Sequence, residues 1–196
     1  MDYSVSKTKF GEKPEFEYPK PLFLQEMGED GLKKLFSDFY DLVVDSDIGN
    51  FFPQDEEELE KIKAHNVKFF IEACGGEKHY SKAVGHFDML KTHEKFSITE
   101  KARREWLGCM EEVLRKVDIS PEAKQSFWNF LETFSKHTVN VDEKLELEEN
   151  QHKEYNSKNK NQPTTEETKY TKSEEDYFKS QMLSSIKKGE DRKSVV

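Results

Sequence analysis

The chain has 196 residues, of which 36% are charged and 34% hydrophobic, and its net charge is −9. This polar composition, with 15 phenylalanines, predicts a compact aromatic core with a solvated remainder, and the negative charge argues against nucleic-acid binding. No apolar stretch approaches the roughly 20 residues that span a bilayer. The N-terminus lacks the hydrophobic segment of a secretory signal, so we expect a soluble, cytoplasmic protein.

Residues 1–21 contain Pro14 and Pro19 among charged side chains and show no period, which predicts a flexible extension. A helix is expected next, ending near Asp45, because apolar residues recur at spacings of three and four. The members of this stripe are Leu32, Leu35, Phe36, Phe39, Tyr40 and Val43.

A second helix is expected from about Glu56 to Cys74. Gly75 and Gly76 end it, since glycine readily adopts the left-handed conformation of a helix cap. A long irregular loop, rich in His, Gly and Lys, is expected from residue 77 to about residue 95. Irregular segments of this length are usually functional.

Two further helices are predicted from their N-terminal signals. Thr99 resembles an N-cap, and Ser120 followed by Pro121 places proline at the first helical position. The last helix is expected to continue to His137. No run shows sustained strand alternation, so the fold class is all-α, a small helical sandwich with a core at residues 22–141.

Residues 142–196 form a charged segment with few aliphatic side chains, which predicts a disordered tail. The two cysteines, Cys74 and Cys109, have no metal-type spacing and are expected to be free thiols in a reducing compartment.

The six histidines form no HExxH or similar metal motif, and there is no phosphate-binding glycine loop or nucleophile elbow. His93 lies between apolar residues, with Met89 and Leu90 before it and Phe96 and Ile98 after it. A lone histidine is more often a surface residue. An apolar, aromatic surrounding is nevertheless what a single axial imidazole on haem requires.

Five ordered segments resemble the truncated haemoglobins of group II. The longest is GGEKHYSKAVGHFDMLKTHEKFSIT at 75–99, which is similar to that family's GG-x3-Y-x4-GH-x6-H-x2-F-x-I-T run. The others are MGEDGLKKLFSDFY at 27–40, Phe52-Pro53, WLGCM at 106–110 and HTVN at 137–140. The resemblance covers the core and neither terminal segment, and it implies a two-over-two helical sandwich around haem b.

The resemblance implies roles for individual residues. His93 corresponds to the proximal ligand of the haem iron, and Tyr40 and Trp106 correspond to distal hydrogen-bond donors. Phe52 corresponds to the aromatic residue that packs on the haem, with Phe51 as the competitor one position away.

Further haem contacts are expected around these residues. Ile62 is expected to be an apolar gate and Asn66 a polar distal contact, and His65, beside them, is a weaker candidate for a distal ligand. The remaining candidates are Phe69, Tyr80, Met89, Lys91 and Phe96.

One departure concerns the haem propionates. The family often has basic residues immediately before the proximal histidine, whereas this chain has Leu90 and Thr92 around Lys91. Lys91 and Tyr80 are the two candidates for that contact.

The resemblance implies reversible binding of dioxygen or another diatomic ligand such as nitric oxide. Two distal donors predict tight retention, which suits nitric oxide detoxification or peroxide reduction, with a reductase as partner, better than rapid delivery. The sequence does not choose between these activities. The alternatives are a haem-based gas or redox sensor acting through the tail, and a helical interaction module that has lost haem.

Overall fold

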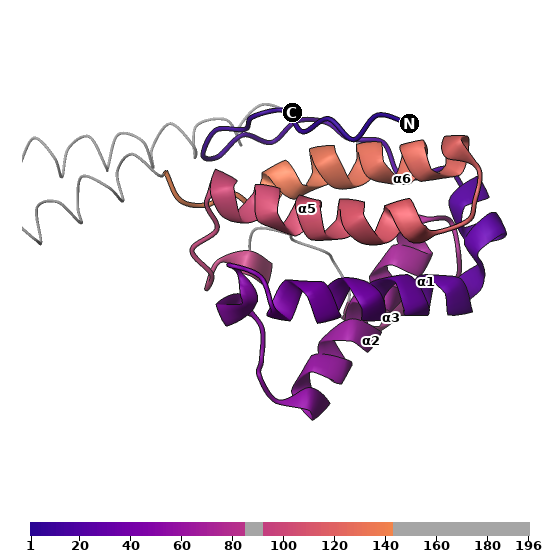
Figure 1. Ribbon diagram of the computed structural model, residues 1–196, viewed down its shortest axis with the longest axis horizontal. Coiled ribbons are helices and arrows are strands. Elements are labelled where there is room, and N and C mark those ends of the chain that lie inside the picture. Colours follow the sequence, from indigo (N-terminus) through magenta and orange to yellow (C-terminus); the bar gives the residue numbers. More distant parts are fainter. Residues whose placement is uncertain (85–91, 143–196) are drawn as a thin grey trace, which may run out of the picture. The chain divides into compact units, whose positions relative to one another are not determined.

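The structure, a computed structural model, describes residues 1–84 and 92–142 (Figure 1). Within these ranges it contains helices and turns but no strand, which confirms the all-α class. None of the helices there is both long enough and apolar enough to cross a membrane. The elements are α1 (Leu22–Val44), the 3-10 helix η1 (Gly49–Phe51), α2 (Glu56–Ala73), α3 (His79–Val84), α5 (Glu100–Lys116), α6 (Pro121–Phe134) and the 3-10 helix η2 (Ser135–Thr138).

Helix α1 is kinked near its start and amphipathic after the kink. Gly28 has φ 67°, a left-handed conformation that favours glycine, and it separates a first short turn from the long part of the helix. The helix ends where the Ser46 backbone and hydroxyl both donate to the Val43 carbonyl. Its long part buries the predicted stripe, Leu32, Leu35, Phe36, Phe39, Tyr40 and Val43.

Both ends of α2 follow from local chemistry. The Asp55 side chain accepts from the backbone N–H of Glu58 at 2.9 Å, which caps the first turn. At the other end Gly75 has φ 84°, and the Gly76 N–H donates to the Ile71 carbonyl at 2.9 Å. A Cβ atom on Gly76 would lie 2.6 Å from Ile71 Cγ2. A side chain at this position would therefore clash, so glycine is also required here for steric reasons.

The segment after Gly76 differs from the expected irregular loop, because residues 79–84 form the short helix α3. A helix of six residues is not stable from local propensity alone. It is held instead by tertiary contacts: Tyr80 is 5% exposed, and the Ser81 N–H donates to Glu72 Oε2 at 2.9 Å. Sequence periodicity carries no signal for such a helix.

The predicted caps of α5 and α6 are confirmed. The Thr99 hydroxyl accepts from the backbone N–H three residues on at 3.1 Å, and Ser120 does the same at 3.3 Å, followed by Pro121 in the first turn. Helix α6 ends at Phe134, earlier than expected. The chain then tightens into η2, which contains His137.

The helices pack as two pairs. Helix α1 contacts α2, α5 contacts α6, and α1 packs against both α5 and α6. Figure 1 shows α5 and α6 running alongside one another next to α1, the two-over-two arrangement. Stacked phenylalanines hold the arrangement together. The ring centroids of Phe23 on α1 and Phe127 on α6 lie 4.0 Å apart and join the two pairs, and those of Phe36 and Phe70 lie 4.4 Å apart within the α1–α2 pair.

The N-terminal segment, residues 1–21, differs from the expected flexible extension in being packed. It has no regular helix or strand up to Pro21, as expected, but it runs along α6 (Figure 1). Tyr3 packs edge-on against Trp128 at 5.0 Å, and Phe16 packs edge-on against Phe134 at the same distance. Isolated aromatic residues that cover another helix leave no periodic pattern, which is why sequence periodicity did not reveal this packing.

A buried arginine ties this segment to the helices. The Arg103 side chain is fully buried, and its guanidinium donates to the Ser6 carbonyl at 3.1 Å and to Ser135 Oγ at 3.0 Å. It also pairs with the carboxylates of Glu100 at 3.1 Å and Glu132 at 2.8 Å. Its charge is therefore fully compensated, as burial of a charge requires.

Two expectations lie outside the described residues. The disordered tail falls on residues 143–196, apart from its first residue, and the sensor hypothesis depends on that tail. Met89, Leu90 and Lys91 fall in 85–91.

Candidate functional site

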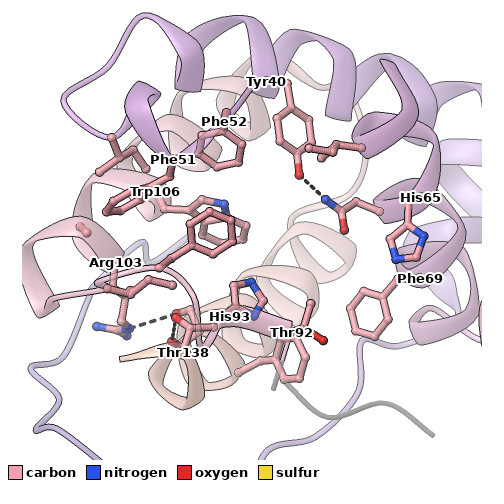
Figure 2. Close-up of a pocket in the computed structure, with 18 of the residues that line it drawn as sticks. Tyr40, Phe51, Phe52, His65, Phe69, Thr92, His93, Arg103, Trp106 and Thr138 are labelled. Carbon is pink, nitrogen blue, oxygen red and sulfur yellow. Dashed lines mark hydrogen bonds between the residues drawn. The ribbon is translucent and has the colours of Figure 1, made fainter. Parts of the chain in front are cut away.

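A cavity of about 520 Å³ opens between the helix pairs, within the usual size range of small-molecule sites, about 300–1,000 Å³. Aromatic side chains dominate its walls, and Figure 2 shows them arranged around an open centre. The aromatic lining residues are Tyr40, Phe51, Phe52, Phe69, Phe70, Tyr80, Phe96, Trp106 and Phe134.

Tyr40 reaches the cavity from the buried face of α1. It is 3% exposed, and its ring packs against Phe52 with centroids 5.6 Å apart. Asn66 Nδ2 on α2 donates a hydrogen bond to the phenolic oxygen. Burial raises the pKa of Tyr40 well above its ordinary value, against the smaller opposing effect of the Asn66 hydrogen bond. The hydroxyl therefore stays protonated at any physiological pH.

Trp106 enters from α5 on the same side of the cavity as Phe51 and Phe52 (Figure 2). Its indole packs edge-on against Phe39, with centroids 5.2 Å apart and planes at 76°. Figure 2 shows the indole nitrogen turned toward the centre of the cavity. An N–H donor from α5 and an O–H donor from α1 therefore face the same space.

The face of α2 forms another wall. Ile62 and Asn66, one helical turn apart, both line the cavity, and His65 lies beside them. The His65 ring packs edge-on against Tyr80 at 4.9 Å, and Tyr80 in turn packs against Phe69 at 5.3 Å. Helix α3 thus supports this wall through one buried tyrosine.

His93 lies across the cavity from Tyr40, with its imidazole directed inward (Figure 2). Thr92 and His93 are helical, and a tight turn follows directly, in which the Phe96 N–H donates to the His93 carbonyl at 3.0 Å. Phe96 lines the cavity and lies 6.0 Å from Phe51, ring to ring. The imidazole therefore faces a cavity whose lining includes these two aromatic rings.

The charged residues that line the cavity are all basic. They are Lys61, Lys95 and Arg103, and among the described lining residues there is no aspartate or glutamate. Lys95 also lies over the Phe96 ring, 5.1 Å from its centroid. Arg103 is already paired with Glu100 and Glu132, so Lys61 and Lys95 are the cations that favour a ligand with an apolar body and an anionic edge.

The described residues contain no cluster of three or more His, Cys, Asp or Glu side chains that could hold a bare metal ion. A single imidazole in an aromatic cavity suits instead a metal whose other ligands come from a flat organic ring. Haem has this character: its iron takes one axial imidazole, and its carboxylates suit nearby cations. The residues present therefore fit haem.

The cavity unites the residues predicted from the sequence. Nine of the eleven candidates line it, and Met89 and Lys91 lie outside the described residues. Phe51 and Phe52, treated as competitors, both line it, as does His65. The nine are Tyr40, Phe52, Ile62, Asn66, Phe69, Tyr80, His93, Phe96 and Trp106.

Sequence reasoning missed the basic lining residues Lys61, Lys95 and Arg103. Arg103 had a detectable signal, because it falls on the apolar stripe that Trp106 and Met110 continue at intervals of three and four. A charged residue on a buried face predicts a compensated interior charge. The two lysines are unremarkable in a sequence this rich in lysine.

An all-helical two-over-two sandwich around such a cavity defines a globin of the short type. A family model for the bacterial-like globins matches residues 23–140, and the chain belongs to this family. Globin membership implies binding of haem and of a small ligand at its iron.

Named relatives agree with this assignment. The group 2 truncated haemoglobin YjbI of Bacillus subtilis is 28% identical over 120 residues, covering 61% of this chain and 89% of the relative. The structure of a truncated oxygen-avid haemoglobin from the same species is 27% identical, with a TM-score of 0.56, over 60% of this chain and 98% of that one. Hell's gate globin IV in its phosphate-bound form is 29% identical, with a TM-score of 0.64, over 70% of this chain and 87% of that one. The predicted resemblance to group II truncated haemoglobins is confirmed.

Proposed function

We propose that this globin holds haem b through His93 and retains dioxygen, or another diatomic ligand, by hydrogen bonds from Tyr40 and Trp106. The observation that carries the proposal is geometric. One imidazole and two hydrogen-bond donors face each other across a single cavity that is otherwise lined by aromatic rings.

Haem, when bound, would supply an iron at which a diatomic ligand can bind, and His93 would hold that iron. In this chain Phe52, Phe69 and Phe96 would hold the flat ring by apolar contact. Lys61 and Lys95, which line the same cavity, would meet its carboxylates, a role that the sequence assigned to Lys91 or Tyr80. Ile62 would limit access from the α2 side.

Tyr40 and Trp106 would act on the ligand as hydrogen-bond donors. A hydrogen bond to a partner that carries charge stabilises by about 1.5–3 kcal/mol, and each 1.4 kcal/mol corresponds to a factor of about ten in dissociation. Two donors would thus slow release by a few powers of ten. The structural relative described as oxygen-avid supports slow release here.

Slow release of dioxygen suits redox chemistry at the iron better than it suits oxygen delivery. We extend the proposal to nitric oxide detoxification or peroxide reduction in the cytoplasm, with a reductase returning the iron to its reduced state. The free thiols agree with a reducing compartment. Burial raises the pKa of Cys74 to about 12, so this thiol is inert.

The test is an optical titration of the purified protein with haem. We expect a Soret band with one-to-one stoichiometry, and we expect His93→Gly to lose the iron–imidazole signature until free imidazole is added. His65→Leu, also in the cavity, is the matched control and keeps the signature. Absence of a Soret band in the wild-type protein overturns the proposal. Loss of the iron–imidazole signature in His65→Leu but not in His93→Gly would assign the iron ligand to His65.

A further inference from the structure

Asn140 binds the turn that carries His93 from a distant part of the chain. It follows η2, directly after the buried Val139, and lies 47 residues from His93 in sequence. Asn140 Nδ2 donates to the His93 carbonyl at 3.1 Å and to the Phe96 carbonyl at 2.8 Å. Asn140 Oδ1 accepts from the Ile98 N–H at 2.8 Å, and the Asn140 N–H donates to the Ile98 carbonyl at 3.0 Å.

The side-chain amide of Asn140 matches this set of partners. The turn presents two carbonyl acceptors and one N–H donor, and an amide offers two N–H donors and one acceptor oxygen. A carboxylate of the same shape would keep the Ile98 contact but would set a negative oxygen against the carbonyls of His93 and Phe96. A leucine would leave all three groups without this partner.

We propose that Asn140 is a positioning residue for His93: its amide fixes the backbone from which the imidazole projects, and so fixes the angle at which the imidazole meets the haem iron. This inference rests on the proposed function. The backbone is held at the His93 carbonyl, at the end of the turn at Phe96 and just beyond it at Ile98, so rotation of the turn requires breaking hydrogen bonds at three points.

The decisive variant is Asn140→Asp in the full-length protein. The matched control is Asn129→Asp, the same chemical change at an exposed position on α6. Two measurements are made on ferrous, ligand-free protein: the iron–imidazole stretching band by resonance Raman, and the rate of haem loss to an excess of a high-affinity haem acceptor. The Raman band comes only from haem-bound molecules, so it reports on the variant even if its yield is low.

We expect Asn140→Asp to shift and broaden the stretching band and to lose haem about tenfold faster, while Asn129→Asp matches the wild type. Asn140→Ser, which keeps a single hydroxyl for the turn, should lie between them. A wild-type band and a loss rate within twofold of wild type in Asn140→Asp overturn the inference, as does a lower melting temperature with an unchanged band. A wild-type protein without any iron–imidazole band refutes the proposed function instead, so the two failures are distinguishable.

Discussion

The side-chain amide of Asn66 donates to the phenolic oxygen of Tyr40, so the tyrosine oxygen acts as an acceptor toward α2. Its own proton remains available to donate, and the buried ring cannot swing far because Phe52 and Phe39 pack edge-on against it. This arrangement suits the donor role proposed for Tyr40. The relationship gives Asn66 a buried hydrogen-bond partner on the wall that it shares with Ile62 and Phe69.

Tyr40→Phe removes the donor and keeps the ring. Loss of one charge-assisted hydrogen bond should speed dioxygen dissociation about 10- to 100-fold, measured by stopped-flow displacement with carbon monoxide. Tyr18→Phe, the same change on a side chain that is 63% exposed, should leave the rate unchanged. An unaltered rate in Tyr40→Phe would remove this residue from the distal contacts.

Asn66→Leu leaves the Tyr40 hydroxyl without its fixed partner. We expect dissociation to be faster than in the wild type but slower than in Tyr40→Phe, because the donor remains and only its orientation is lost. In the double variant, Asn66→Leu should add little to Tyr40→Phe. Full additivity of the two effects would show that Asn66 acts independently of the tyrosine.

Trp106→Phe removes the second donor. Dioxygen dissociation should again accelerate by about tenfold or more, and the free energy of unfolding should change little, because the indole is only partly buried. Trp128→Phe is the matched comparison: this indole is 1% exposed and donates to the Ser4 carbonyl. It should lower stability and leave the dissociation rate alone. Faster dissociation in Trp128→Phe with an unchanged rate in Trp106→Phe would contradict the donor role of Trp106.

Arg103→Met tests the buried ion pairs. Removing the guanidinium leaves Glu132 and Glu100, both largely buried, without their shared partner, and should lower the free energy of unfolding by about 3–5 kcal/mol. Arg104→Met, at an exposed arginine that pairs with the same Glu100, should cost less than about 1 kcal/mol. Urea unfolding measures both, and equal effects would refute a special role for Arg103.

The environment of Glu132 predicts that part of the free energy of unfolding is lost at low pH. Burial acts to raise its pKa, but hydrogen bonds from Ser6, Lys136 and Arg103 outweigh burial, so the pKa lies below the ordinary 4.5. A lowered folded-state pKa contributes stability that is present above the ordinary value and is lost as the pH falls through the folded value. The gap in unfolding free energy between wild type and Glu132→Gln should therefore shrink from pH 7 to pH 3. A constant gap would contradict this prediction.

The packed N-terminal segment predicts that a residue outside every described helix contributes to stability. Phe16 contacts Phe130, Phe134 and His137, so Phe16→Ala should lower the free energy of unfolding by about 1–3 kcal/mol. Phe10→Ala, at a ring that is 57% exposed, is the control and should change it by less than about 0.5 kcal/mol. Equal stability of both variants would show that residues 1–21 are a loose extension.

Much of the fold follows from the sequence because it depends on local signals. The apolar stripe of α1, the caps at Thr99 and Ser120, and the glycine stop at Gly75 are all readable in the chain itself. The candidates His93, Tyr40 and Trp106 were also reached from sequence, through the ordered motifs around them. The structure confirms the helices and gathers the three residues at one cavity, while their roles stay a prediction.

Tertiary structure alone decided three features: the short helix α3, the packing of residues 1–21 on α6, and the hydrogen bonds from Asn140 to the turn of His93. Each depends on contacts between different segments of the chain, which leave no period and no local motif. Arg103 was readable as a charge on an apolar stripe, but its partners Ser6 and Glu132 were not. Local propensity and amphipathic spacing determine where helices form, whereas long-range packing decides which side chains complete the site.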